Sequence, residues 1–204
     1  MAGTYGDMQT RIADELARSD LTSQIQLSIL DAVKAYEGER FYFNELYNQT
    51  ATVTLSAYAI ALPSNVYAID KLTLKVNSSV NDYMVQRNRD YILSMQTPLS
   101  IHQPKEFAIY NGQIQFDCMA DQTYPLYISG LQKFDALSTN ADTNVWTTTA
   151  EELIRNRAKC NLYLDVILDP DNAKICAAQE QRALSYLRTR AAGMASGRIT
   201  PTFF

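Results

Sequence analysis

The sequence has few of the side chains that build catalytic and metal sites. It contains one histidine, His102, and three cysteines, none of them in a Cys-x-x-Cys spacing. It has no glycine-rich phosphate loop, no Gly-x-Ser-x-Gly motif and no His-Glu-x-x-His motif. A loop histidine without a second histidine or a cysteine pair makes a poor metal site. We therefore expect no catalytic residue, no metal, no cofactor and no enzyme activity.

Long apolar runs and an N-terminal targeting segment are also lacking. No stretch approaches the roughly 20 apolar residues that a membrane span needs. Residues 1–7 hold neither a basic patch nor an apolar run. Three scattered cysteines fit a reducing compartment, where they act as small buried hydrophobic residues. We expect no signal peptide, no membrane contact and assembly in the cytoplasm.

An excess of positive charge is lacking as well. The 204 residues carry a net charge of −4, which argues against broad nonspecific binding of nucleic acid. Residues 181–204 nevertheless contain four arginines and no acidic residue. This basic end suits docking onto an acidic surface, and a solvated helix end is the alternative explanation.

Apolar residues at helical spacing are present near both ends of the chain. They predict two helices before Gly38 and two more after residue 148. The last helix is predicted to begin at Asp169-Pro170, with Asp169 as its cap, and to reach Gly193. Two pairs have the spacing of capping boxes: Ser23 with Gln26, and Thr148 with Glu151.

The middle of the chain alternates between apolar and polar residues, as strands do. Residues 50–55, 68–76 and 124–133 are predicted strands, and residues 89–95 a short helix. Asn111-Gly112 lies between two alternating runs and predicts a tight hairpin, because both residues accept positive φ. The fold class is α+β, a helical bundle of N-terminal and C-terminal helices with an inserted antiparallel β domain. The expected boundaries are 1–46 and 148–193 for the bundle, 47–147 for the β-rich region and 194–204 for an extended C-terminal arm.

Three consecutive aromatic residues, Phe41, Tyr42 and Phe43, separate the first helices from the β-rich region. Such a run has no single helical or strand face, so its rings cannot all point into one core. Two interpretations stay open. The rings fill the junction between the helices and the sheet, or some of them meet a neighbouring subunit at a seam.

The C-terminal arm is unusually apolar for a chain end. Pro201 excludes a helix there, and three large apolar side chains gather within the last six residues. Ordering the eight residues from Gly197 onward costs about 8–16 kcal/mol of backbone entropy. Burying the three apolar side chains returns only about 5–9 kcal/mol. A frayed terminus is one explanation, and docking on a partner or an adjacent subunit is the other. The candidate contact residues are Arg198, Ile199, Pro201, Phe203 and Phe204.

Several segments occur together in an order known from one group of virus proteins. They are Asp20-Leu21-Thr22, Glu39–Glu45, Tyr58–Pro63, Ile69–Val76, Pro104–Tyr110 with Asn111-Gly112, Tyr124–Lys133 and Asn144–Asp169. Together with the opening pair of helices, these segments cover about residues 8–190. Over this range the sequence resembles the head-to-tail adaptor proteins of tailed bacteriophages, also called head-completion or neck connector proteins. No segment is a catalytic signature, and the likeness lies in their order.

The resemblance implies a structural protein of the virion neck. Proteins of this group form a homo-oligomeric ring, expected here to be a dodecamer, that docks under the portal protein. The ring extends the channel through which packaged DNA passes without sequence-specific binding, and it carries the tail or nozzle proteins.

Two alternatives remain open from the residues alone. One is another tail or neck accessory protein, similar to a tube terminator, although the terminal helices argue against a chain dominated by sheet. The other is a soluble module that binds a ligand on a tyrosine-rich sheet, since the chain has thirteen tyrosines and one tryptophan.

Overall fold

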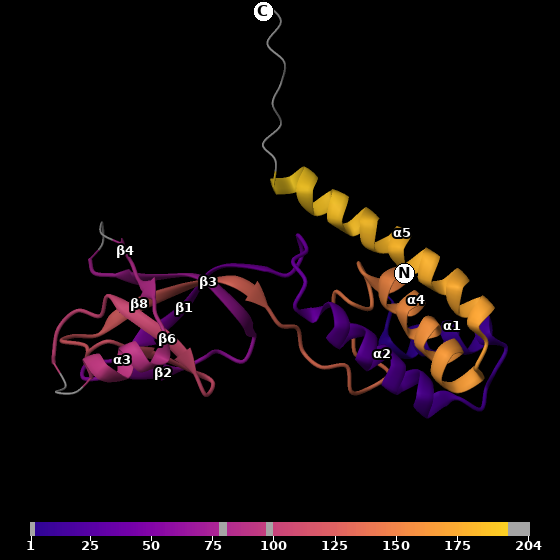
Figure 1. Ribbon diagram of the computed structural model, residues 1–204, viewed down its shortest axis with the longest axis horizontal. Helices are drawn as coiled ribbons and strands as arrows, with labels where there is room; N and C mark the ends of the chain where they lie inside the picture. The colour runs from indigo at the N-terminus through magenta and orange to yellow at the C-terminus, as the bar shows by residue number, and fades with distance from the viewer. Residues whose placement is uncertain (1–2, 78–80, 97–99, 196–204) are drawn as a thin grey trace, which may run out of the picture. The chain divides into compact units, whose positions relative to one another are not determined.

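The computed structural model describes residues 3–77, 81–96 and 100–195, and it has the expected α+β fold (Figure 1). The chain divides into two compact units. Residues 1–43 and 134–204 form a helical unit, and residues 44–133 form a β unit. The expected boundaries differ from these at residues 44–46, which belong to the β unit, and at residues 134–147, which belong to the helical unit.

The helical unit is built from segments at both ends of the chain. Its helices are α1 (Tyr5–Leu16), α2 (Thr22–Glu37), α4 (Glu151–Leu162) and α5 (Pro170–Ala195), with a π-helical turn at Tyr163–Ile167 between the last two. In Figure 1, α4 and α5 form an antiparallel hairpin beside α1 and α2. The core of this unit contains residues from both ends of the chain, which are separated by about a hundred positions. It can therefore form only after these two ends have met.

Local capping explains where two of these helices begin. The Thr4 hydroxyl accepts a hydrogen bond from the Asp7 N–H, and the Asp7 carboxylate accepts one from the Thr4 N–H, which completes a capping box. At α5, the Asp169 carboxylate accepts hydrogen bonds from the N–H groups of Asp171 and Asn172. The prediction of an Asp169 cap with Pro170 in the first turn is confirmed.

The two capping boxes predicted elsewhere are wrong. Helix α2 begins at Thr22 after Leu21, and helix α4 begins at Glu151 after Ala150, in both cases without a side-chain cap. Leu21 is instead buried in the helical core. The Thr148 hydroxyl donates to the Asn144 carbonyl, so a preceding turn uses the group expected to cap α4.

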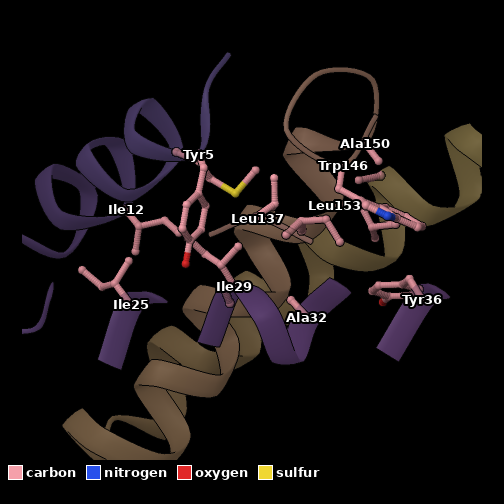
Figure 2. Packing of buried hydrophobic residues seen from close by; sticks show 14 of the residues in the cluster. Tyr5, Ile12, Ile25, Ile29, Ala32, Tyr36, Leu137, Trp146, Ala150 and Leu153 are labelled. Carbon is pink, nitrogen blue, oxygen red and sulfur yellow. The ribbon is translucent and has the colours of Figure 1, made fainter. Parts of the chain in front are cut away.

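The core of the helical unit is a continuous apolar cluster (Figure 2). Met8 and Ile12 of α1 pack with Ile29 of α2 and Leu153 of α4, and all four are at most 1% exposed. Removing each such side chain from water contributes about 1.5–3 kcal/mol. Leu137 and Trp146 fill the same cluster, which ties the segment before α4 to this unit and not to the sheet.

The β unit contains two four-stranded sheets. One has the order β1-β8-β3-β4 and the other β2-β7-β6-β5. The strands are β1 (Glu45–Val53), β2 (Ala59–Ala61), β3 (Val66–Lys75), β4 (Asn81–Tyr83), β5 (Val85–Gln86), β6 (Glu106–Tyr110), β7 (Gln113–Phe116) and β8 (Tyr124–Gln132). Among the described residues, six pairs of strands are hydrogen-bonded to each other. Five of these pairs are antiparallel, as predicted, whereas β5 pairs parallel with β6.

Several elements of this unit form where the local sequence predicts them. Asn111 and Gly112 have φ of 49° and 69° and join β6 to β7, which confirms the predicted hairpin. Helix α3 spans Arg89–Met95, as predicted. Leu72 and Leu74 of β3 point into the apolar core, while Lys71 lies on the outer face, so the alternation of the sequence sets which face is buried.

Candidate interaction surfaces

The aromatic run after α2 lies within the helical unit. Phe41 is fully buried, and its ring stacks on that of Phe43 with centroids 5.1 Å apart. Trp146 meets both rings edge-on, at 6.2 Å from Phe41 and 5.5 Å from Phe43, and Phe134 closes the group at 6.1 Å from Trp146. These distances are those of favourable aromatic pairs. Phe41 and Phe43 thus serve intramolecular packing.

Tyr42 faces a different environment from its two neighbours. It is half-buried, and the Arg190 guanidinium of α5 lies 4.7 Å from its ring centroid, close enough for a cation–π contact. Two residues earlier, Arg188 forms an ion pair with Glu39. Two of the four terminal arginines therefore bind the segment after α2, which holds the end of α5 against it.

The candidate contact residues of the C-terminal arm belong to the end of the chain. They lie outside the described part of the chain: Arg198, Ile199, Pro201, Phe203 and Phe204.

The basic run at positions 155–159 is used inside the helical unit. The Glu15 carboxylate of α1 meets Arg155 at 2.5 Å and Lys159 at 2.6 Å on α4. Burial favours the protonated form of Glu15, but hydrogen bonds from Lys159 and Arg155 outweigh it and hold the pKa of Glu15 below its ordinary value. The run therefore ties α1 to α4.

The third cation of the run, Arg157, lies beside a buried carboxylate. Glu180 of α5 is 3% exposed, and the Tyr36 hydroxyl of α2 donates a short hydrogen bond to it. Arg157 approaches the same carboxylate oxygen at 3.4 Å. A buried charge is costly unless it is paired in this way, so the trio contributes to the register of α2, α4 and α5.

A shallow hollow of about 180 Å³ opens on the helical unit. Leu27 of α2 and Val166 of the π-helical turn line it and are 63% and 41% exposed. Asp31 and Asp165 supply its charged groups, and no lysine or arginine is among its lining residues. We call this the acidic hollow. Other exposed apolar side chains are Leu164 in the π-helical turn, Leu168 directly after it and Ile175 on α5.

A larger hollow of about 490 Å³ opens on the outer face of the β1-β8-β3-β4 sheet. Its lining residues include Lys71 and Lys75 but no aspartate or glutamate: Tyr47, Asn48, Lys71, Thr73, Lys75, Tyr83, Tyr127 and Ser129. The Lys71 ammonium lies 4.0 Å above the Tyr83 ring, and Tyr47 is 84% exposed. We call this the basic hollow.

Sequence reasoning missed both hollows, for different reasons. Lys71, Thr73 and Lys75 alternate along one predicted strand, so their common face could have been recognised. Asp31 and Asp165 are 134 positions apart, and only the packing of α2 against α4 brings them to one surface.

Among the described residues, no helix is both long and apolar enough to cross a bilayer.

Comparison with protein families gives a match over almost the whole chain. A family model described as SU10 adaptor protein matches residues 3–201, which include both units. No curated protein matches the chain.

Proposed function

This chain belongs to the SU10 adaptor protein family, and from that membership we propose that it works as a head-to-tail adaptor in the neck of a tailed bacteriophage. Membership makes it a structural adaptor protein of a phage virion. In our proposal, copies of the chain form a ring that docks under the portal protein. The ring extends the channel through which DNA passes without sequence-specific contacts, and it provides the platform for tail proteins.

The observation that carries this proposal is the extent of the family match. A match over residues 3–201 includes the helical unit, the β unit and most of the C-terminal arm. The shared property is therefore the whole architecture and not one motif. A protein that acts through its shape needs such an architecture, because each surface must meet a different neighbour.

The two hollows support a ring of identical subunits. One carries two carboxylates with exposed Leu27 and Val166, and the other carries two lysines with exposed tyrosines. The two hollows carry opposite charges and lie on different units of one chain. This suits a heterologous contact between subunits, in which the surface at the acidic hollow of one copy meets the surface at the basic hollow of the next. Such a contact uses different patches on the two partners and closes into a ring when the rotation allows it.

Their apolar residues matter more for the strength of this contact than their charges. An exposed ion pair contributes only about 0.2–1 kcal/mol, whereas desolvated aromatic and aliphatic side chains supply most of the energy of an interface. The charges would instead determine which surfaces meet and in which register.

We also propose roles for the residues singled out from the sequence. The arm residues Arg198, Ile199, Pro201, Phe203 and Phe204 would insert into the portal or an adjacent subunit, a proposal that rests on their sequence. Of the junction rings, Tyr42 is the one we place at a subunit seam, since Phe41 is buried and Phe43 packs on Trp146.

The direct test mixes the purified full-length chain with its capsid portal and measures the mass and symmetry of the product. The proposal expects an annular complex that follows the symmetry of the portal and contains many copies of the chain. A particle that stays monomeric and indifferent to the portal in all conditions contradicts it.

A charge-swap series tests the contact between copies. Lys71→Glu with Lys75→Glu, and separately Asp31→Lys with Asp165→Lys, should each weaken ring formation. The fourfold variant carrying all these changes should restore it, since the complementary signs are re-established. As a control, Lys174→Glu changes a lysine that is 76% exposed and pairs with Asp171 three residues away. Equal loss in every variant, without rescue, would mean that the hollows do not meet.

A further inference from the structure

Three potential metal ligands of different types converge in the β unit. They are the imidazole of His102, the carboxylate of Asp117 and the thiol of Cys118, and their ligand atoms all lie within 4.8 Å of one another. Spacing along the chain does not predict this cluster, because His102 is fifteen residues from Asp117 and the chain has no second histidine. The folding of the segment before β6 against the end of β7 brings the three together.

Backbone hydrogen bonds hold the two segments in place. The His102 N–H donates to the Met119 carbonyl at 3.0 Å, and the Met119 N–H donates to the Ser100 carbonyl at 2.9 Å. Ile101 and Met119 form a parallel β-bridge between the same segments. The ligand-bearing backbone is therefore preorganised. Metal binding requires side-chain rotations and the release of the Cys118 thiol proton, which in the free protein is donated to the His102 carbonyl at 3.1 Å.

The carboxylate and the imidazole are also oriented by their neighbours. The Asp117 carboxylate accepts a hydrogen bond from the Lys105 N–H at 3.2 Å. The His102 Nδ1 atom lies 2.9 Å from the Gln103 carbonyl oxygen. Hydrogen bonds of this kind to a backbone carbonyl or from a backbone amide commonly fix the orientation of metal ligands.

The distances fit a tetrahedral cation after a small contraction. Zn²⁺ binds sulfur at about 2.3 Å and nitrogen or oxygen at about 2.0–2.2 Å, which places its ligand atoms about 3.3–3.7 Å apart. Since the ligand atoms here lie within 4.8 Å of one another, they need to approach by at most about 1–1.5 Å to reach that spacing. Cys118 and Asp117 are buried while His102 is exposed, so the open fourth position is accessible to water.

A mixed sulfur, nitrogen and oxygen set is selective among cations. Thiolate and imidazole favour Zn²⁺ and similar transition metals, whereas Mg²⁺ and Ca²⁺ prefer sets made of oxygen alone. We infer that His102, Asp117 and Cys118 form a three-ligand site for Zn²⁺, with water as the fourth ligand. The bound ion links the segment before β6 to the segment after β7 and so stabilises the β unit. This inference does not depend on the proposed neck function.

Co²⁺ tests the site directly, because a thiolate bound to Co²⁺ produces a sulfur-to-metal charge-transfer absorption. The purified full-length chain should show this absorption on titration with Co²⁺, and Zn²⁺ should abolish it by displacement. Zn²⁺ should also raise the melting temperature. Absence of the absorption with excess Co²⁺ overturns the inference.

Variants separate this site from the other two thiols. Cys118→Ser should remove the absorption, whereas Cys160→Ser combined with Cys176→Ser should leave it in place. His102→Ala changes an exposed side chain, so it should keep the fold while weakening Zn²⁺ binding by at least about tenfold. An absorption that persists in Cys118→Ser, or Zn²⁺ affinity unchanged in His102→Ala, contradicts the site.

Discussion

Trp146 is the residue on which the aromatic packing of the helical unit depends. It is 1% exposed and makes edge contacts with Phe41, Phe43 and Phe134. It comes from the segment before α4, whereas Phe41 and Phe43 follow α2. A single side chain thus joins three parts of the chain, and its loss leaves a cavity that none of them can fill alone.

We predict that Trp146→Ala lowers the free energy of unfolding of the helical unit by about 3–5 kcal/mol. Urea denaturation, followed by far-UV circular dichroism, measures this change. Tyr186→Ala is the matched control, since Tyr186 lies on α5 of the same unit and is 65% exposed. The control should change stability by less than about 0.5 kcal/mol. Equal effects of the two substitutions would contradict the packing described here.

Tyr36 makes stability depend on pH at the alkaline end. Burial raises its pKa above the ordinary 10.0, and the hydrogen bond to Glu180 raises it further. In the unfolded chain the hydroxyl ionises near its ordinary pKa, whereas the folded chain retains the proton to higher pH. The contribution of this proton is therefore complete below about pH 10 and is lost as the pH rises from there toward the folded-state pKa.

Tyr36→Phe should flatten this dependence. The variant has no hydroxyl to titrate, so its free energy of unfolding should fall less steeply above about pH 10 than that of the wild type. Urea unfolding at a series of alkaline pH values measures the slope. Tyr5, Tyr124 and Tyr163, whose pKa values are also raised, remain in both proteins and cancel in the comparison. The same slope in both proteins would exclude Tyr36 as its source.

At the scale of elements, Gly130 decides how β8 pairs with β3. Gly130 lies opposite Ile69, next to an irregularity in the register at Ile69 and Lys71. A Cβ atom at this glycine would lie 2.1 Å from the Ala68 carbonyl oxygen, which is impossible without moving the strand. The close approach of two backbones, not a turn, is what requires glycine here.

A pair of glycine substitutions separates steric from conformational effects. Gly130→Ala should break the local pairing of β8 with β3 and lower the melting temperature strongly. Gly112→Ala meets open space and carries only the strain of its positive φ, about 1–2 kcal/mol. Thermal melting, with amide hydrogen exchange of β3 and β8, distinguishes the two. A milder effect at Gly130 than at Gly112 would refute the close approach.

At the scale of the whole molecule, we propose that the C-terminal arm serves assembly and not the fold. Ordering its backbone costs more than burying its own apolar side chains returns, so docking requires hydrogen bonds from a partner. A ring that presents many arms at once would strengthen docking through effective concentration.

Deleting residues 197–204 should abolish attachment to the portal while leaving the melting temperature unchanged. Co-sedimentation with portal particles measures attachment, and calorimetry measures melting. A variant with Phe203→Ser and Phe204→Ser should show intermediate attachment, because it keeps the backbone of the arm but loses most of its apolar surface. Full attachment of the deleted chain would assign portal binding to another surface.

The order and type of most elements could be predicted because their signals are local. The Asn111-Gly112 hairpin, the helix at 89–95 and the start of α5 at Asp169-Pro170 each depend on residues within one turn. The burial of Leu72 and Leu74 likewise follows from their spacing in β3, whereas Ile69 joins the same core only through the register irregularity between Ile69 and Lys71. The sequence alone therefore determined the α+β class and the placement of helices around a β-rich middle.

Only the tertiary structure decided which segments pack together. Residues 134–147 belong to the helical unit because Leu137 and Trp146 fill its core, and no periodicity in that segment indicates this. The aspartates of the acidic hollow and the ligand set at His102, Asp117 and Cys118 likewise come together through long-range packing. Local spacing records the repeat of a helix or strand, whereas these sites depend on contacts between elements, which spacing does not encode.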